Sequence, residues 1–142
     1  MKAYADASFL ISLYSTDANS TAAARVMRSS QGDRYITALC ELEVVNALQL
    51  RVFRKEVSRT QAQSSLMDFD QDVRYGIFHL RSLSDHIFKR AQLLSEQTTA
   101  RLGTRTSDLL HVAAAVELGA DYLYTFDQRQ RKLARAVRLK LN

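Results

Sequence analysis

The chain alternates short β-favouring runs with longer stretches in which apolar residues recur every three or four positions. Lys2–Ala5 is such a run, and the pattern after it predicts a helix over Ala7–Tyr14. Arg34–Thr37 is a second run, followed by a Leu- and Val-rich stretch that predicts a helix to about Lys55. Between these two units, Asp17 or Ser20 can cap a further helix, which is rich in Ala and ends at Ser29.

The middle of the chain repeats this pattern with less regular strands. Ser58 or Thr60 can cap a helix that continues to about Arg74. Gly76–Leu80 is predicted as a third strand, and the apolar spacing after it predicts a helix to about Ala100.

The C-terminal part has the clearest signals for where helices and strands begin and end. A helix is predicted to begin near Thr104 and to stop at Gly119, a residue type that commonly follows a helix. Tyr122–Thr125 is predicted as a strand, and it is followed by a helix to Ala136 and an edge strand within Val137–Leu141.

Strands that alternate with helices predict an α/β fold, in which a mostly parallel central sheet is flanked by helices on both faces as a three-layer sandwich. The chain has 142 residues, of which 46% are hydrophobic, so residues 1–142 are expected to form a single domain with its own core.

Composition narrows the class of protein further. No apolar run approaches the roughly 20 residues needed to span a bilayer, and the N-terminus does not resemble a signal peptide, which predicts a cytoplasmic protein. Cys40 is the only cysteine, so an intramolecular disulfide and a cysteine-based zinc cluster are excluded. It lies among apolar residues and is expected to be buried.

The formal net charge is +5, and the excess is concentrated near the C-terminus. A basic surface of this kind attracts phosphates, although charge alone favours a solvated face that aids solubility. The basic residues that crowd this end are Arg129, Arg131, Lys132, Arg135, Arg138 and Lys140.

Acidic residues occupy the boundaries between the predicted elements. Asp6 and Asp127 follow strands, Asp108 lies in the first turn of a helix, and Glu43 lies in the early turns of another. The carboxyl ends of parallel strands share one edge of the sheet, so these side chains can converge there. Each Asp is also explained as a helix cap or a dipole partner. Periodicity alone does not separate Glu43 from Glu41.

Converging carboxylates would repel one another unless a cation were present. Oxygen ligands suit Mg²⁺ or Mn²⁺, and such ions activate water for attack on a phosphodiester. The basic excess would then hold the phosphate backbone of a nucleic acid.

Three segments are similar to the PIN domain, and more narrowly to VapC-type toxins of prokaryotic toxin–antitoxin pairs. The segments are YADASFLISLY, ITALCELEVVNAL and RTSDLLHVAAAVELGADYLYTFDQRQRKLA. Their D-x-S, E-x-x-N-A, D-x-x-H-x-A and T-F-D-x-R blocks stand in the order typical of the family, and the resemblance spans essentially the whole chain.

The resemblance implies a PIN-like fold and a catalytic, metal-binding acidic quartet. It selects Glu43, the acid three residues before Asn46, over Glu41. The quartet is Asp6, Glu43, Asp108 and Asp127, with Ser8, Asn46 and Thr125 as supporting residues.

The resemblance also implies an Mg²⁺- or Mn²⁺-dependent endoribonuclease of a type II toxin–antitoxin system. Such an enzyme hydrolyses single-stranded RNA with a metal-activated water and leaves 3′-hydroxyl and 5′-phosphate ends. Homodimerisation and a cognate antitoxin are implied as well. In this interpretation Asp6, Glu43 and Asp108 are metal ligands, and Asp127 binds a second ion or acts through water.

Two other functions fit parts of the pattern. A non-catalytic nucleic-acid or protein-binding module would use the acidic residues only as caps. A phosphotransferase would use Asp6 as a nucleophile, although its D-x-S spacing lacks the second Asp that such enzymes often carry. His111, three residues after Asp108, is either a metal partner of that Asp or a buried, hydrogen-bonded helix histidine, and the second explanation is preferred.

Overall fold

The computed structural model describes residues 1–142 and contains five strands and seven helices. The strands are β1 (Lys2–Ala5), β2 (Asp33–Thr37), β3 (His79–Arg81), β4 (Tyr122–Tyr124) and β5 (Lys140–Leu141). The helices are α1 (Ala7–Tyr14), α2 (Ser20–Ser29), α3 (Ala38–Phe53), α4 (Arg59–Arg74), α5 (Asp85–Leu102), α6 (Thr106–Glu117) and α7 (Gln128–Ala136).

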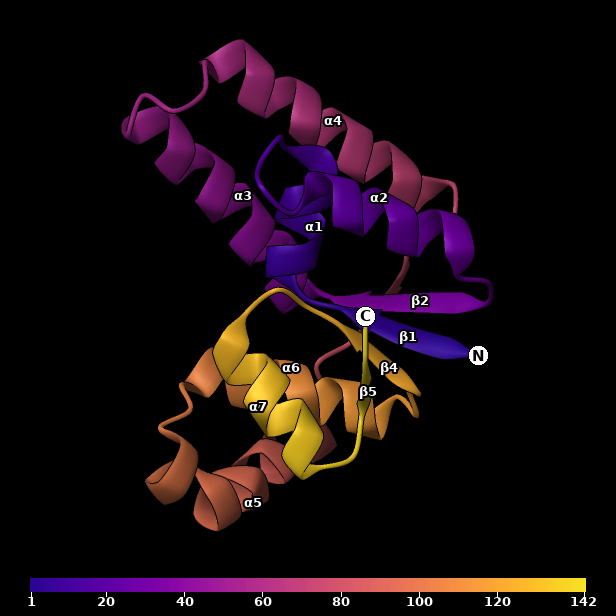
Figure 1. Ribbon diagram of the computed structural model, residues 1–142, viewed down its shortest axis with the longest axis vertical. Helices are drawn as coiled ribbons and strands as arrows, with labels where there is room; N and C mark the ends of the chain where they lie inside the picture. The colour runs from indigo at the N-terminus through magenta and orange to yellow at the C-terminus, as the bar shows by residue number, and fades with distance from the viewer.

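The strands form one parallel sheet in the order β3-β2-β1-β4-β5. Helices α1–α4 lie on one face of the sheet and α5–α7 on the other, as Figure 1 shows. The chain first builds the sheet outward from β1 to β3 and then crosses to β4, so the direction of winding reverses between β1 and β4. This arrangement confirms the predicted α/β sandwich, and in such sheets ligands bind at the point of reversal.

The elements begin and end close to the predicted positions, with two exceptions. Gly76–Leu80 was predicted as the third strand, but β3 begins only at His79. Gly76 has φ +76°, and the Ile77 amide donates to the carbonyl oxygen of Asp72 at 2.9 Å, so these residues close the end of α4. The glycine therefore ends a helix instead of opening a strand.

The start of α2 also differs from the prediction that Asp17 or Ser20 caps it. Asn19 occupies the N-cap position and makes no side-chain capping bond. The Asp17 carboxylate instead accepts hydrogen bonds from Ser12 (2.9 Å) and Arg51 (3.2 Å), and this ties the α1–α2 loop to α3. None of the helices combines the length and the apolar composition of a membrane-spanning segment.

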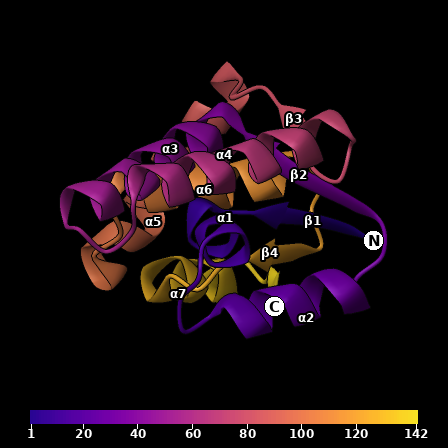
Figure 2. The ribbon, with the colours of Figure 1, turned by 90° about the horizontal axis from the view of Figure 1, so that it is seen from above.

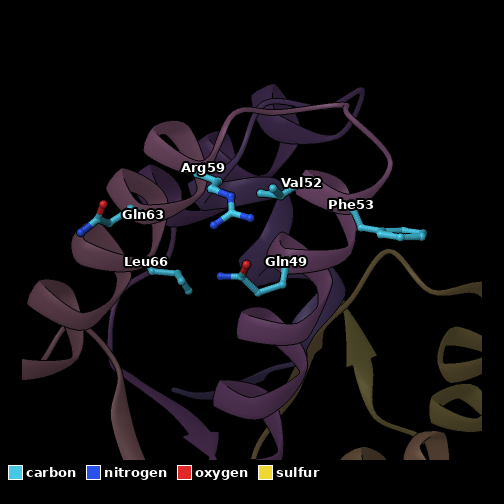
Figure 3. Close-up of a pocket in the computed structure, with 6 residues that line it drawn as sticks. All are labelled: Gln49, Val52, Phe53, Arg59, Gln63 and Leu66. Atoms are coloured by element: carbon cyan, nitrogen blue, oxygen red, sulfur yellow. The ribbon is translucent and has the colours of Figure 1, made fainter.

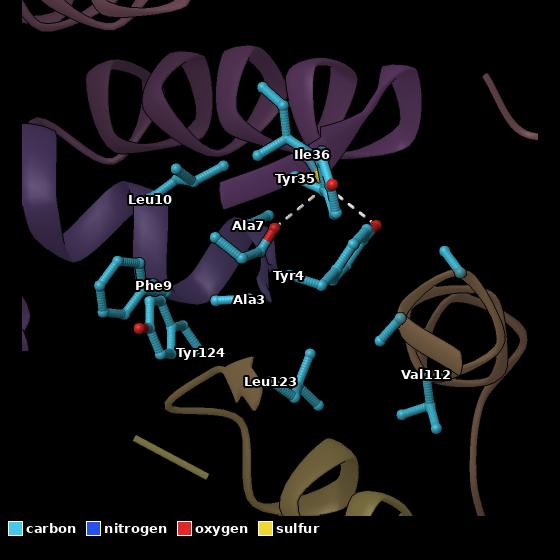
Figure 4. Close-up of a cluster of buried hydrophobic side chains, with 14 of the residues drawn as sticks. Ala3, Tyr4, Ala7, Phe9, Leu10, Tyr35, Ile36, Val112, Leu123 and Tyr124 are labelled. Carbon is cyan, nitrogen blue, oxygen red and sulfur yellow. Dashed lines mark hydrogen bonds between the residues drawn. The ribbon is translucent and has the colours of Figure 1, made fainter. Parts of the chain in front are cut away.

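The core is built around β1 at the centre of the sheet. Tyr4 on β1, Ile36 on β2 and Leu123 on β4 are 0% exposed, and they pack with Val112 of α6 and Leu10 of α1. Figure 4 shows these side chains on both faces of the sheet. The predicted burial of Cys40 is confirmed, since its exposed fraction is 0%.

Helices α3 and α4 run side by side, as Figure 2 shows, and a cleft of about 510 Å³ lies between them at the end where the loop joins them. Gln49 and Arg59 point into the space between the two helices, whereas the Phe53 ring points away from it (Figure 3). Phe53 is 82% exposed, and Leu42 and Met67 on the same two helices are also exposed. This hairpin therefore presents apolar surface that its own chain leaves uncovered.

The packing around β1 predicts the effect of truncation in the core. Leu123→Ala is expected to lower the free energy of unfolding by about 2–5 kcal/mol, because it removes buried methyl groups and leaves a cavity. Leu42→Ala, at a position that is 66% exposed, should change it by no more than about 0.5 kcal/mol. Urea unfolding of both variants measures the difference, and equal losses would contradict the assigned core.

Candidate functional site

Asp6 lies where β1 ends and α1 begins, at the reversal point of the sheet. Its amide still pairs with the Tyr124 carbonyl of β4 at 3.1 Å, while its side chain caps α1 by accepting from the Phe9 amide at 2.9 Å. The same carboxylate accepts from the Ser8 hydroxyl at 2.7 Å and from the Thr125 hydroxyl at 2.6 Å. The D-x-S spacing thus lets the Ser8 hydroxyl contact the Asp6 carboxylate from the first turn of α1. Thr125, directly after the neighbouring strand β4, contacts it too.

The Asp6 carboxylate is 0% exposed. Burial raises its pKa, and the charge of His111 and the hydrogen bonds from Thr125, Phe9 and Ser8 offset this only in part. A buried carboxylate without a full counter-charge is a favourable ligand for a cation, because the cation restores the electrostatic balance that burial removes.

Glu43 of α3 is held by a second network that begins on the other face of the sheet. The His111 ring of α6 lies with Nε2 2.5 Å from Glu43 Oε1 and with Nδ1 2.9 Å from the Tyr4 hydroxyl. That hydroxyl also lies 3.0 Å from Thr37 Oγ1 and 3.2 Å from Cys40 Sγ. A chain of hydrogen bonds therefore runs from α6 through β1 to α3.

Burial lowers the pKa of His111, but the hydrogen bonds with Cys40 and Glu43 outweigh burial and raise it to about 10. The ring is therefore an imidazolium near neutral pH, and both of its nitrogens donate. Nε2–H donates to Glu43, and Nδ1–H donates to Tyr4. The buried cation fixes the position of one Glu43 oxygen and leaves the other free.

Asp127 lies just after β4 and caps α7. Its Oδ1 accepts from the Arg129 amide at 2.8 Å and from the Gln130 amide at 3.1 Å. Its own amide donates to the Thr125 hydroxyl at 3.0 Å, so Asp127 and Asp6 are positioned by the same threonine. Asp127 therefore acts as a helix cap, as one of the two sequence-based explanations predicted. Capping uses only Oδ1 of its two carboxylate oxygens.

A cleft of about 290 Å³ brings these residues together, and we refer to it as the acidic cleft. Three of the four predicted acidic residues line it: Asp6 after β1, Glu43 on α3 and Asp127 before α7. The predicted supporting residues Ser8 and Asn46 line it too. The full lining is Asp6, Ala7, Ser8, Ile11, Glu43, Asn46, Ala47, Leu50, Asp127 and Gln130.

Asp108 is not part of this lining. It is 3% exposed, and its Oδ2 accepts from the Arg105 amide at 2.9 Å at the start of α6. In this structure the side chain completes a helix cap, so a ligand role for Asp108 stays a prediction. Thr125 also contributes from beneath the cleft, through its bond to Asp6.

The donor atoms of the acidic cleft suit a hard cation. Carboxylate oxygens of Asp6, Glu43 and Asp127 and the amide of Asn46 face one space, and no cationic side chain lines it. No three Asp, Glu, His or Cys side chains are close enough to enclose a bare ion. Mg²⁺ usually binds through one or two carboxylates and keeps several of its waters, so a site for it does not need side chains that enclose the ion.

A family model describes residues 3–136 as a PIN domain. The chain belongs to the PIN domain family. The resemblance seen in the sequence motifs is thereby confirmed, and the matched residues include all four acidic positions of the predicted quartet. Comparison with curated protein sequences gave no match.

Solved structures share the fold of this PIN domain at low sequence identity. The VapC20 toxin of Mycobacterium tuberculosis, described as cleaving the sarcin-ricin loop, superposes with a TM-score of 0.71 at 17% identity, over 94% of each chain. VapBC2 of Rickettsia felis, bound to a promoter DNA fragment, gives 0.69 at 16% identity, over 100% of this chain and 98% of the other. A toxin–antitoxin complex from Klebsiella pneumoniae gives 0.64 at 18% identity, covering 90% and 88%.

Three residues of the PIN domain site were not assigned their structural roles by sequence reasoning. His111 is a buried, hydrogen-bonded helix histidine, as preferred from the sequence, but its partner is Glu43 of another helix and not Asp108. Tyr4 carries no motif that would mark it. Gln130 lines the acidic cleft at 5% exposure, and its side-chain oxygen has no hydrogen-bond partner. Only His111 lies in a recognisable sequence block.

The hub position of the Tyr4 hydroxyl predicts its contribution to stability. Tyr4→Phe removes the nearer partner of His111 Nδ1 and leaves only Cys40 Sγ at 3.9 Å, so it should lower the free energy of unfolding by about 1–3 kcal/mol, because a buried donor loses its main acceptor. Tyr75→Phe removes a hydroxyl from a residue that is 74% exposed and serves as the control. Urea unfolding that showed the same stability for both variants would contradict the network.

Proposed function

We propose that this PIN domain is the endoribonuclease toxin of a type II toxin–antitoxin pair, and that it hydrolyses phosphodiester bonds in single-stranded RNA with the help of Mg²⁺ or Mn²⁺. One observation carries the proposal: Asp6, Glu43 and Asp127, from three separate segments, line one cleft at the reversal point of the sheet. Solved structures with this fold include the VapC20 toxin, which is described as cleaving the sarcin-ricin loop.

A bound divalent ion would supply a more acidic water and would neutralise charge on the phosphodiester. We assign Asp6 and Glu43 as its ligands, with Asp127 as a ligand of a second ion or a partner of its waters. Asp108 is assigned to this group on the family resemblance alone, since its carboxylate caps α6 in the structure.

The other residues of the chain hold these ligands in place. Ser8 and Thr125 donate to Asp6 and keep both of its oxygens oriented. His111 donates to one oxygen of Glu43 and directs the other toward the cleft. A water oxygen attacks phosphorus, and the bond to the leaving 3′ oxygen breaks, so that one product ends in a 3′-hydroxyl and the other in a 5′-phosphate. Fixed ligands favour this reaction because little reorganisation is needed.

A cognate antitoxin and a second copy of the chain complete the proposed assembly. Two structural relatives are described as toxin–antitoxin assemblies. In this protein Leu42, Phe53 and Met67 of the α3–α4 hairpin are exposed, and exposed apolar side chains favour a protein partner. We assign this hairpin to the antitoxin.

A non-catalytic binding module remains the second candidate, and one observation favours it. Asp108 and Asp127 both accept backbone hydrogen bonds as helix caps, which is sufficient structural reason for their presence. Glu43 separates the two functions, because its position within α3 has no capping role and its carboxylate lines the cleft.

Substitution of Glu43 tests the proposed activity. Purified, antitoxin-free protein should cleave single-stranded RNA with Mg²⁺ or Mn²⁺ and lose this activity with EDTA. Glu43→Gln should reduce the rate by at least about 100-fold, because loss of outer partners of metal ligands alone typically costs about 10- to 100-fold. The readout is the rate of appearance of RNA fragments on a denaturing gel.

Glu41→Gln is the matched control, since Glu41 lies on the same helix two positions earlier and does not line the cleft. It should retain the rate of the unchanged protein. Cleavage that persisted in Glu43→Gln and in EDTA would exclude the metal site, and RNA binding without any cleavage would favour the binding module.

Placement of the antitoxin on the α3–α4 hairpin is tested by co-expression. Phe53→Asp should greatly reduce the amount of neighbouring-gene antitoxin that co-purifies with the tagged toxin, because a charge would enter an apolar contact. Phe88→Asp changes an exposed Phe on α5 and should leave the yield unchanged. Equal yields from the two variants would remove the hairpin as the antitoxin site.

A further inference from the structure

The acidic cleft continues into two further clefts along the same surface. The middle cleft, of about 340 Å³, shares Ser8, Ile11 and Asp127 with the acidic cleft. A third cleft of about 460 Å³ shares Asn19 and Phe126 with the middle cleft, and we call it the basic cleft. Together the three form one groove that runs from the ends of β1 and α3 to the space between α2 and α7.

The charge of the groove changes sign along its length. The acidic cleft is lined by three carboxylates and no Lys or Arg. In the middle cleft Arg51 and Asp17 form an ion pair at 3.2 Å that largely cancels their charges. The basic cleft is lined by Arg25 and Arg131 and by no Asp or Glu, and Asn142, which also lines it, accepts two long hydrogen bonds of 3.5 Å from Arg131. A ligand that fills the groove must therefore meet a cation at one end and carry negative charge at the other.

The two arginines of the basic cleft come from opposite walls. Arg131 of α7 is held in place because its guanidinium donates to the Thr125 carbonyl oxygen at 2.8 Å. Arg25 of α2 is exposed and takes part in none of the ion pairs of the structure. Figure 2 shows α2 and the C-terminal end of the chain on the α7 side of the molecule. Guanidinium groups match phosphate oxygens with paired hydrogen bonds, so this cleft suits a phosphate.

Phe126 stands at the junction of the middle and basic clefts. Its ring stacks on Phe9 with the centroids 5.7 Å apart and the planes at 18°, which fixes its orientation. Aromatic rings interleaved with basic side chains are the usual elements of single-strand binding, because each unpaired base has a face that can stack.

We propose that the basic cleft binds a backbone phosphate of the same RNA strand whose neighbouring phosphodiester lies in the acidic cleft. Arg25 and Arg131 hold that phosphate, and Phe126 packs against a base between the two ends. The inference rests on the proposed nuclease function and adds the direction in which the strand leaves the catalytic cleft. Arg25 is thereby a substrate-positioning residue.

The test compares Arg25→Gln with Arg28→Gln. Both residues are exposed arginines on α2 outside any ion pair, but only Arg25 lines the groove. Binding of a fluorescein-labelled single-stranded RNA is measured by anisotropy over a series of salt concentrations. Ca²⁺ replaces Mg²⁺, because it takes the same oxygen ligands, and a gel verifies that the RNA is intact afterwards.

Arg25→Gln should weaken RNA binding several-fold and reduce the slope of log affinity against log salt by about 0.7, the value for one lost phosphate contact on a single strand. Arg28→Gln should retain both the affinity and the slope. The midpoint of thermal unfolding should be the same in both variants, which shows that the difference arises in binding and not in folding.

Indistinguishable affinities and slopes for the two variants would overturn the inference. A loss of antitoxin binding in Arg25→Gln with unchanged RNA binding would also overturn it, and would assign the groove to a protein. The proposed function is judged separately, by metal-dependent cleavage in the unchanged protein. If that protein cleaves RNA and the two arginine variants bind alike, the nuclease stands and only the strand path fails.

Discussion

The structure depends on keeping one carboxylate buried at the point where the sheet reverses. An ionised group removed from water is costly unless hydrogen bonds and counter-charges replace its hydration. For Asp6 the replacement comes from Ser8 and Phe9 in α1 and from Thr125 after β4. The central strands and the first helix must therefore be correctly placed before the site can exist. The remaining imbalance, which raises the Asp6 pKa, is what makes the position suited to a cation.

A second constraint joins the two faces of the sheet. The His111 ring on α6 donates to Glu43 on α3 through one nitrogen and to the Tyr4 hydroxyl on β1 through the other. Because His111 is 0% exposed, moving its ring would break buried hydrogen bonds, so Glu43 is held in a fixed position. The two networks together position two cleft carboxylates from elements that are far apart in the sequence.

The surface divides the proposed tasks between separate regions. The α3–α4 hairpin exposes apolar side chains and suits a protein partner, whereas the groove from the acidic cleft to Arg25 is polar and changes sign along its length. Helix α3 belongs to both regions. Glu43 and Asn46 line the acidic cleft, and Gln49 and Phe53, further along the helix, line the cleft of the hairpin. An occupant of the hairpin would thus contact the same helix that carries a carboxylate of the acidic cleft.

The sequence by itself determined the order of the elements, the parallel sheet and the residues at the strand ends, because apolar periodicity and capping act over a few residues. The prediction that Gly76 opens a strand was wrong, because a glycine can equally end a helix, and here it closes α4. The family motifs selected Glu43, and the cleft contains it. Only the tertiary structure decided that His111 serves Glu43, that Asp108 caps its own helix, and that Gln130 and Arg25 line the groove. Glu43 and His111 come from helices on opposite faces of the sheet, and Arg25 and Arg131 from opposite walls of one cleft. Which such side chains meet is set by the packing of those helices, and no local pattern encodes it.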